Sequence, residues 1–250
     1  MDEELLRGRI SSWQPPARQE PSSDLSPSDD DPATDDDLPA PELPAVHRYL
    51  VQLIVDRDEA NALYRRFVPD LQRVAQHSAE SRVGRSRLLL RSSLIRGLVA
   101  LQQSEHCPLP IPELNASTEE ARFDAIWRTE LLERTWQRLR RLQEETGQPY
   151  FLALRQRSET PGLSAPELAD RIAHVLDRPI STSTTQRLLR RANSQFSRML
   201  LEEVIATLPE NPPFETIERE LIETNLLAFC REAIGSLRHR SSPPHRRPIG

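Results

Sequence analysis

The sequence predicts an all-α protein in which a helical N-terminal segment is followed by a C-terminal helix-turn-helix domain. Apolar residues recur at spacings of three and four over several long stretches, which is the spacing of one helix face. Serines stand where helix caps are expected, and prolines separate the periodic stretches. The first residues of the chain lack this periodicity, so we expect a disordered acidic tail in front of the helical part.

The expected tail covers residues 1–43 and is rich in Pro, Ser and Asp. Residues 1–44 contain twelve acidic residues and three arginines, a net charge of −9, whereas the whole chain carries −5. Such a composition buries too little apolar area to offset the entropy that is lost on ordering. The remainder of the chain is mildly basic, at +4, which is compatible with a nucleic-acid partner but does not require one.

Residues 44–106 form the first expected helical region. Their apolar spacing predicts helices over residues 47–55, 57–76 and 82–103. The third helix has a surplus of apolar positions, so it is expected to pack against the first two helices or against a partner. A proline-rich, extended linker is expected over residues 107–116.

Residues 117–235 form the second expected domain. Ser117 is expected to cap a long helix, and Gly147 is expected to end that helix just before a proline. A closing helical segment is expected to stop at Gly235. The basic residues 236–250 are then either a disordered end or a nonspecific phosphate-binding arm.

The helix-turn-helix is expected between residues 164 and 208. Ser164 and Glu167 have the spacing of a capping box at the start of the first helix. Pro179 breaks the helical pattern, and Ser181 is expected to cap the second helix. The inward stripe of the first helix is predicted to contain Leu168, Ile172, Val175 and Leu176.

The outer face of the second helix carries hydroxyl, amide and guanidinium groups. Between Ser181 and Leu201 there are four arginines and no carboxylate. A recognition helix places such groups against base edges and phosphates in the major groove. The alternative is an arginine-rich solvated face, since all 33 basic residues of the chain are arginine. The candidate DNA-binding residues are Thr182, Ser183, Thr184, Gln186, Arg187, Arg190 and Arg191.

Three separated stretches carry a resemblance to a known family: FDAIWRTELLERTWQRL, TGQPYFLALRQRSETPGLSAPELADRI and LLRRANSQFSRMLLEEV. They span a little under half of the chain, over residues 123–233. This part resembles the C-terminal region of extracytoplasmic-function-type sigma factors of bacterial RNA polymerase, in the version frequent in planctomycetes. The resemblance implies a region-four domain that binds the upstream promoter element and docks on the polymerase.

The same resemblance implies which side chains face the DNA. These are Thr184, Gln186, Arg187, Arg190 and Arg191. Asn193 departs from the family pattern, in which an arginine is usual, so one phosphate contact differs here.

The N-terminal stretch DRDEANALYRRFVPDLQRVAQ resembles the opening helix of sigma-factor region two. A complete region two also has a cluster of aromatic residues that holds the unstacked bases of an opened promoter. Between Gln72 and Arg122 this sequence contains no aromatic residue. Because aromatic stacking is the usual means of holding single-stranded bases, region two looks incomplete.

We therefore expect a DNA-binding transcription initiation factor of sigma type. The expected partners are promoter DNA, the RNA polymerase core and an anti-sigma or other regulatory protein. The alternative is a degenerate sigma homologue that acts as a protein-interaction or regulatory module without opening promoters.

The sequence offers no sign of other functions. It contains no catalytic constellation, no metal-ligand spacing and no phosphate-cradling glycine loop, so neither an enzyme nor a cofactor is expected. Cys107 and Cys230 are far apart in the sequence, as in proteins of a reducing compartment. With no apolar run of about 18 residues, we expect a cytoplasmic protein without a membrane partner.

Overall fold

The computed structural model describes residues 43–81, 86–103 and 114–241, and the regular structure of these residues is entirely helical. The predicted all-α fold is thus confirmed. Most of the expected acidic tail and of the linker, together with residues 242–250, lies outside the described residues. In chain order the helices are α2 (Pro44–Leu53), α3 (Arg57–Ser81), α4 (Ser86–Gln102), α5 (Ala116–Thr146), α6 (Tyr150–Glu159), α7 (Ala165–Val175), α8 (Thr182–Ala206), α9 (Phe214–Glu223) and α10 (Leu227–Ser241).

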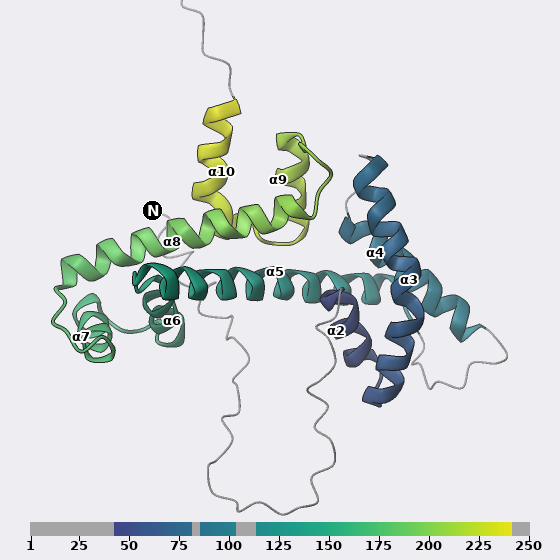
Figure 1. Cartoon of the computed structure of the whole chain (residues 1–250), viewed down its shortest axis with the longest axis horizontal. Helices are drawn as coiled ribbons and strands as arrows, with labels where there is room; N and C mark the ends of the chain where they lie inside the picture. The colour runs from purple at the N-terminus through teal and green to yellow at the C-terminus, as the bar shows by residue number, and fades with distance from the viewer. Residues whose placement is uncertain (1–42, 82–85, 104–113, 242–250) are drawn as a thin grey trace, which may run out of the picture.

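Helix α5 is the axis along which the other helices are arranged (Figure 1). Helices α2, α3 and α4 gather at its N-terminal end, whereas α6 and α7 lie at its C-terminal end. Helix α8 runs antiparallel to α5 and packs along it, and α9 and α10 adjoin the C-terminal part of α8.

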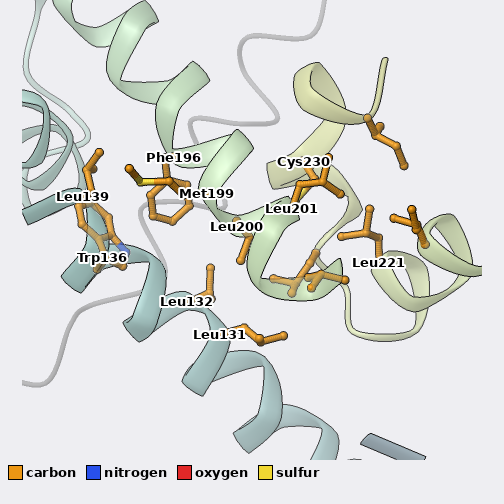
Figure 2. Close-up of a cluster of buried hydrophobic side chains, with 14 of the residues drawn as sticks. Leu131, Leu132, Trp136, Leu139, Phe196, Met199, Leu200, Leu201, Leu221 and Cys230 are labelled. Atoms are coloured by element: carbon orange, nitrogen blue, oxygen red, sulfur yellow. The ribbon is translucent and has the colours of Figure 1, made fainter. Parts of the chain in front are cut away.

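Two hydrophobic clusters meet on α5. The first contains Tyr49 and Leu94 from the N-terminal helices, together with Phe123 from the first turns of α5. The second is built on Trp136 and its neighbours along α5 (Figure 2). Trp127 packs against both clusters, so one continuous helix joins the N-terminal helices to the C-terminal ones.

The second cluster is the larger one and holds α8, α9 and α10 against α5. Figure 2 shows Phe196 and Leu200 of α8 facing α5, and Cys230 on the side of α8 that is turned away from α5. Burial raises the pKa of the Cys230 thiol to about 12, so this side chain stays neutral and packs as a small apolar group.

The cap of α5 differs from the prediction. Asn115, not Ser117, is the N-cap, because its side-chain oxygen accepts hydrogen bonds from the backbone N–H groups of Ser117 (3.1 Å) and Thr118 (3.3 Å). The Ser117 hydroxyl donates to the same oxygen at 2.8 Å. At the other end Gly147 closes the helix with a φ of 67°, as the sequence predicted.

Gly235 does not stop the last helix, which was the prediction; α10 continues to Ser241. A glycine inside a helix costs roughly 1 kcal/mol relative to alanine. Here Ile234 is buried in the second cluster and Leu237 packs against it, so apolar contacts on both sides of Gly235 offset that cost. Residues 236–241, expected to belong to a basic tail, are therefore helical.

A buried arginine links α4 to the C-terminal helices. The Arg87 side chain is 1% exposed and donates to Asp124 of α5 at 2.6 Å, through Nη1. It also donates to Glu220 of α9 through Nε (2.6 Å) and Nη2 (3.3 Å), and to Glu223 through Nη2 (2.6 Å). Burial acts to lower the pKa of Arg87, but the bonds and charges of Glu220 and Asp124 raise it, so the guanidinium remains charged.

Three further contacts of α4 strengthen this link. Arg91, one turn further along α4, donates to the second oxygen of Asp124 at 2.6 Å and lies 3.2 Å from Glu120. The backbone N–H of Ser86 donates to the carbonyl of Thr207, just after α8. The start of α4 is therefore fixed to α5, α8 and α9 at once.

We predict that Arg87→Ala lowers the free energy of unfolding by about 3 to 5 kcal/mol, because it leaves the buried carboxylate of Glu220 without this partner. Urea denaturation followed by circular dichroism measures the effect. Arg96→Ala is the matched control on the same helix, since Arg96 is exposed and, among the described residues, donates to the carbonyl of Ser92 alone. An equal denaturation midpoint for wild type and Arg87→Ala would show that the ion cluster contributes no net stability.

Candidate nucleic-acid interface

Helices α6, α7 and α8 enclose a small cluster of their own. Ala153 of α6 and Leu168 and Ile172 of α7 are buried in it, and Leu188 of α8 packs against them. Val175, which the sequence placed in this stripe, is instead 52% exposed. It is the last residue of α7, where the chain begins to turn, so its side chain no longer faces α8.

The start of α7 has the capping box that the sequence predicted. The Ser164 hydroxyl accepts from the Glu167 N–H, and the Glu167 carboxylate accepts from the Ser164 N–H at 2.8 Å. The Ser164 hydroxyl also donates to the Glu167 carboxylate at 2.7 Å, and this bond, together with the one from the Ser164 N–H, lowers the pKa of Glu167 from its ordinary value. The box therefore contributes stability above the ordinary carboxyl range and loses it as the pH falls through the lowered pKa.

The turn after α7 is a Schellman motif. The Arg178 N–H donates to the Ala173 carbonyl (3.2 Å) and the Asp177 N–H to the His174 carbonyl (3.3 Å). Asp177 occupies the left-handed position with a φ of 47°, where glycine is the commoner residue. These bonds fix the backbone of Arg178 relative to α7.

Helix α8 begins at an uncharged cap. Ser181 is the N-cap, as predicted, and its hydroxyl accepts from the Thr184 N–H at 3.2 Å. The first turn of α8 contains no acidic residue. The positive end of the helix dipole is therefore not compensated by a carboxylate within its own first turn.

The structure leaves most of the candidate residues accessible. Thr182 is half-buried, whereas the other six are exposed: Ser183, Thr184, Gln186, Arg187, Arg190 and Arg191. Thr185, between them, is fully buried and faces the interior. Asn193, the departure from the family pattern, is exposed as well.

The arginines of this surface differ from those further along the chain. Arg198, two turns beyond Arg191, is 3.7 Å from Glu202, and Arg138 of α5 donates to Glu202 and to Glu203. For Arg187, Arg190 and Arg191, the described part of the chain supplies no carboxylate partner. Arg187 donates a long hydrogen bond, of 3.4 Å, to the Thr184 hydroxyl.

A half-open cleft of about 450 Å³ lies between the start of α6, the turn and α8. Arg187 and Arg191 line it from α8, and Arg178 lines it from the turn. Arg178 is exposed and was not among the residues predicted from the sequence, which named only residues of the second helix. Its position three residues before the Ser181 cap is the signal that could have identified it.

This surface is suited to binding a polyanion. It combines exposed guanidinium groups, hydroxyl groups and the positive end of a helix, all of which bind phosphate oxygens well. Among the residues that the structure describes, no cluster of His, Cys, Asp or Glu could hold a metal ion. Within the same residues, none of the helices is long and apolar enough to span a bilayer.

Neither a family model, nor a curated protein, nor a solved structure matches the chain.

We predict that Ser181→Ala destabilises the start of α8 by about 1 kcal/mol, since the Thr184 N–H loses its side-chain acceptor. Ser181→Asn is the matched control, because asparagine caps helices as well as serine does. Urea denaturation compares the three proteins. A loss of equal size in both variants would mean that the serine acts through some contact other than the cap.

Proposed function

We propose that this protein is a DNA-binding transcription initiation factor of sigma type, which recognises promoter DNA through α7 and α8 and associates with the RNA polymerase core. The observation that carries the proposal is that Arg187, Arg190 and Arg191 are all exposed on the N-terminal half of α8. These side chains have no carboxylate partner among the described residues, and they follow a helix start that lacks acidic residues. An anti-sigma or other regulatory protein is a further proposed partner.

The contrast along α8 supports a nucleic-acid ligand over a merely solvated face. In the C-terminal half of this helix, carboxylates at positions 202 and 203 contact Arg198 and Arg138. In the N-terminal half the arginines extend into solvent without such partners. Phosphates would supply the missing negative charge and base edges the missing acceptors.

A second observation concerns the N-terminal helices and supports a limited role in promoter opening. Tyr49 is fully buried and donates to Glu119 at 2.6 Å, and the Tyr64 hydroxyl accepts from the Leu43 N–H. Phe67 packs so closely on α4 that a side chain at Gly97 would collide with its ring. Tyr49 is thus buried in the first cluster, and Tyr64 and Phe67, which are half-buried, pack against it, so packing occupies much of the ring surface that flipped bases would need.

We predict that Arg187→Ala and Arg190→Ala each weaken binding to a selected promoter duplex by about 1 to 3 kcal/mol, with helicity unchanged. Fluorescence anisotropy with labelled duplexes measures the affinity. Arg198→Ala is the control: it removes an arginine from the same helix, but one that lies beside Glu202. Unchanged affinity in both test variants would contradict the proposal and favour a protein-interaction module that does not read DNA.

We also predict that the protein, together with core polymerase alone, opens promoters poorly or not at all. Stacking on aromatic side chains supplies roughly 1 to 3 kcal/mol per held base, and here the rings are occupied. Permanganate footprinting of thymines in the polymerase complex is the test. Strong reactivity that depends on this protein would show that its N-terminal helices rearrange or hold bases by other means.

A further inference from the structure

The cleft beside α8 divides the arginines of the helix into two rows. Thr184, Arg187 and Arg191 follow one another at spacings of three and four, so they lie along one side of α8, and all three line the cleft. Gln186 and Arg190 are four residues apart on the neighbouring row, outside the cleft lining. The two rows therefore face different surroundings, although the sequence presents them as a single basic face.

The lining of the cleft is selective for negative charge. Arg178, Arg187 and Arg191 contribute three guanidinium groups, and the remaining lining residues include no carboxylate. The Ser181 hydroxyl, at the positive end of α8, also lines the cleft. Apolar residues such as Ile180 and Leu188 complete the walls, so the charged groups converge on a limited volume.

We propose that this cleft receives one phosphate of the DNA backbone, and that Arg178 is a phosphate-binding residue, while the row of Gln186 and Arg190 contacts base edges. This inference rests on the proposed function and assigns separate tasks within the same interface. A phosphodiester suits the cleft because its three guanidinium groups can each bind two phosphate oxygens at once and no carboxylate lines it.

Arg178 is well placed to set the register of α8 on the duplex. The Schellman bonds fix its backbone to α7, and the Ser181 cap fixes the start of α8 only three residues later. A phosphate held between Arg178 and Arg191 would thus contact both the turn after α7 and helix α8. Contacts of this kind orient a protein on DNA without reading its sequence.

The test uses the full chain with two duplexes of equal length: one selected by the wild type from a random library, and one unrelated. Affinities are measured by anisotropy between about 50 and 200 mM salt. For Arg178→Ala we expect the same fold loss on both duplexes and a slope of log K against log salt that is about 0.9 shallower, for one lost phosphate contact. For Arg190→Ala we expect that the affinity for the selected duplex, divided by the affinity for the unrelated duplex, is smaller than it is for the wild type.

Arg96→Ala is the charge-matched control, since it removes one exposed arginine from α4, at the other end of the molecule. A second measurement replaces single phosphates of the selected duplex by neutral methylphosphonates. At one position the wild type should lose affinity and Arg178→Ala should lose nothing further. Thermal melting of Arg178→Ala should match that of the wild type, because the side chain is exposed.

The possible results distinguish a failure of the cleft assignment from a failure of the proposed function. Suppose that the wild type binds DNA. If Arg178→Ala then has an unchanged salt slope, or if its loss of affinity adds to the loss at every methylphosphonate position, the assignment of the cleft is wrong while the proposed function stands. A wild type that binds no duplex overturns the proposed function and the inference with it.

Discussion

One buried charge specifies where the N-terminal helix α4 lies relative to α5 and α9. A guanidinium group that is 1% exposed is tolerated only when its hydrogen bonds and its charge are satisfied, and Arg87 finds those partners on two other helices. Asp124 lies on α5 and Glu220 on α9, so the position of α4 is specified relative to both. Hydrophobic contacts alone are non-directional, whereas this fork of hydrogen bonds admits few relative orientations.

Because the chain contains no lysine, its carboxylates are what distinguish structural arginines from arginines that are open to a ligand. With arginine as the only basic residue, both structural and ligand-binding cations have the same side chain, and their surroundings distinguish them. Arg87 and Arg138 are held by carboxylates of other helices, whereas no carboxylate among the described residues holds Arg187 or Arg190. The placement of acidic residues, more than that of arginines, therefore marks the surface that is open to an anionic partner.

Local features of the fold were predictable because they depend on neighbouring residues. The box of Ser164 with Glu167 and the cap at Ser181 form as their sequence patterns indicate. Two local predictions that were wrong, the N-cap of α5 and the end of α10, concern positions where the local pattern fits more than one structure. Asn115 and Ser117 are both good caps, and only the geometry of the first turn selects the asparagine. At Gly235, packing on the second cluster overrides the weak helix preference of glycine.

Other features could not be predicted because they join distant residues. The partners of Arg87 lie 37, 133 and 136 residues away, and no spacing rule connects them. Within the candidate site, the sequence identified the arginines of α8 but not Arg178, because that residue lies in a turn and reaches the cleft only through the folded backbone. The exposed face and the helical spacing of its residues were thus predictable, while the cleft that one row of it lines together with Arg178 was not.

Helix α5, which both hydrophobic clusters share, also sets the distance between the N-terminal helices and the start of α8. Its 31 residues correspond to a length of roughly 46 Å at 1.5 Å per residue. Helices α2 to α4 lie at one end and the start of α8 near the other, as Figure 1 shows. Because α5 is unbroken and Arg87 fixes α4 to it, a partner bound at the N-terminal helices would be held at a defined distance from a ligand bound at the start of α8. A flexible linker in place of α5 would instead let the two ends of the molecule bind their ligands independently.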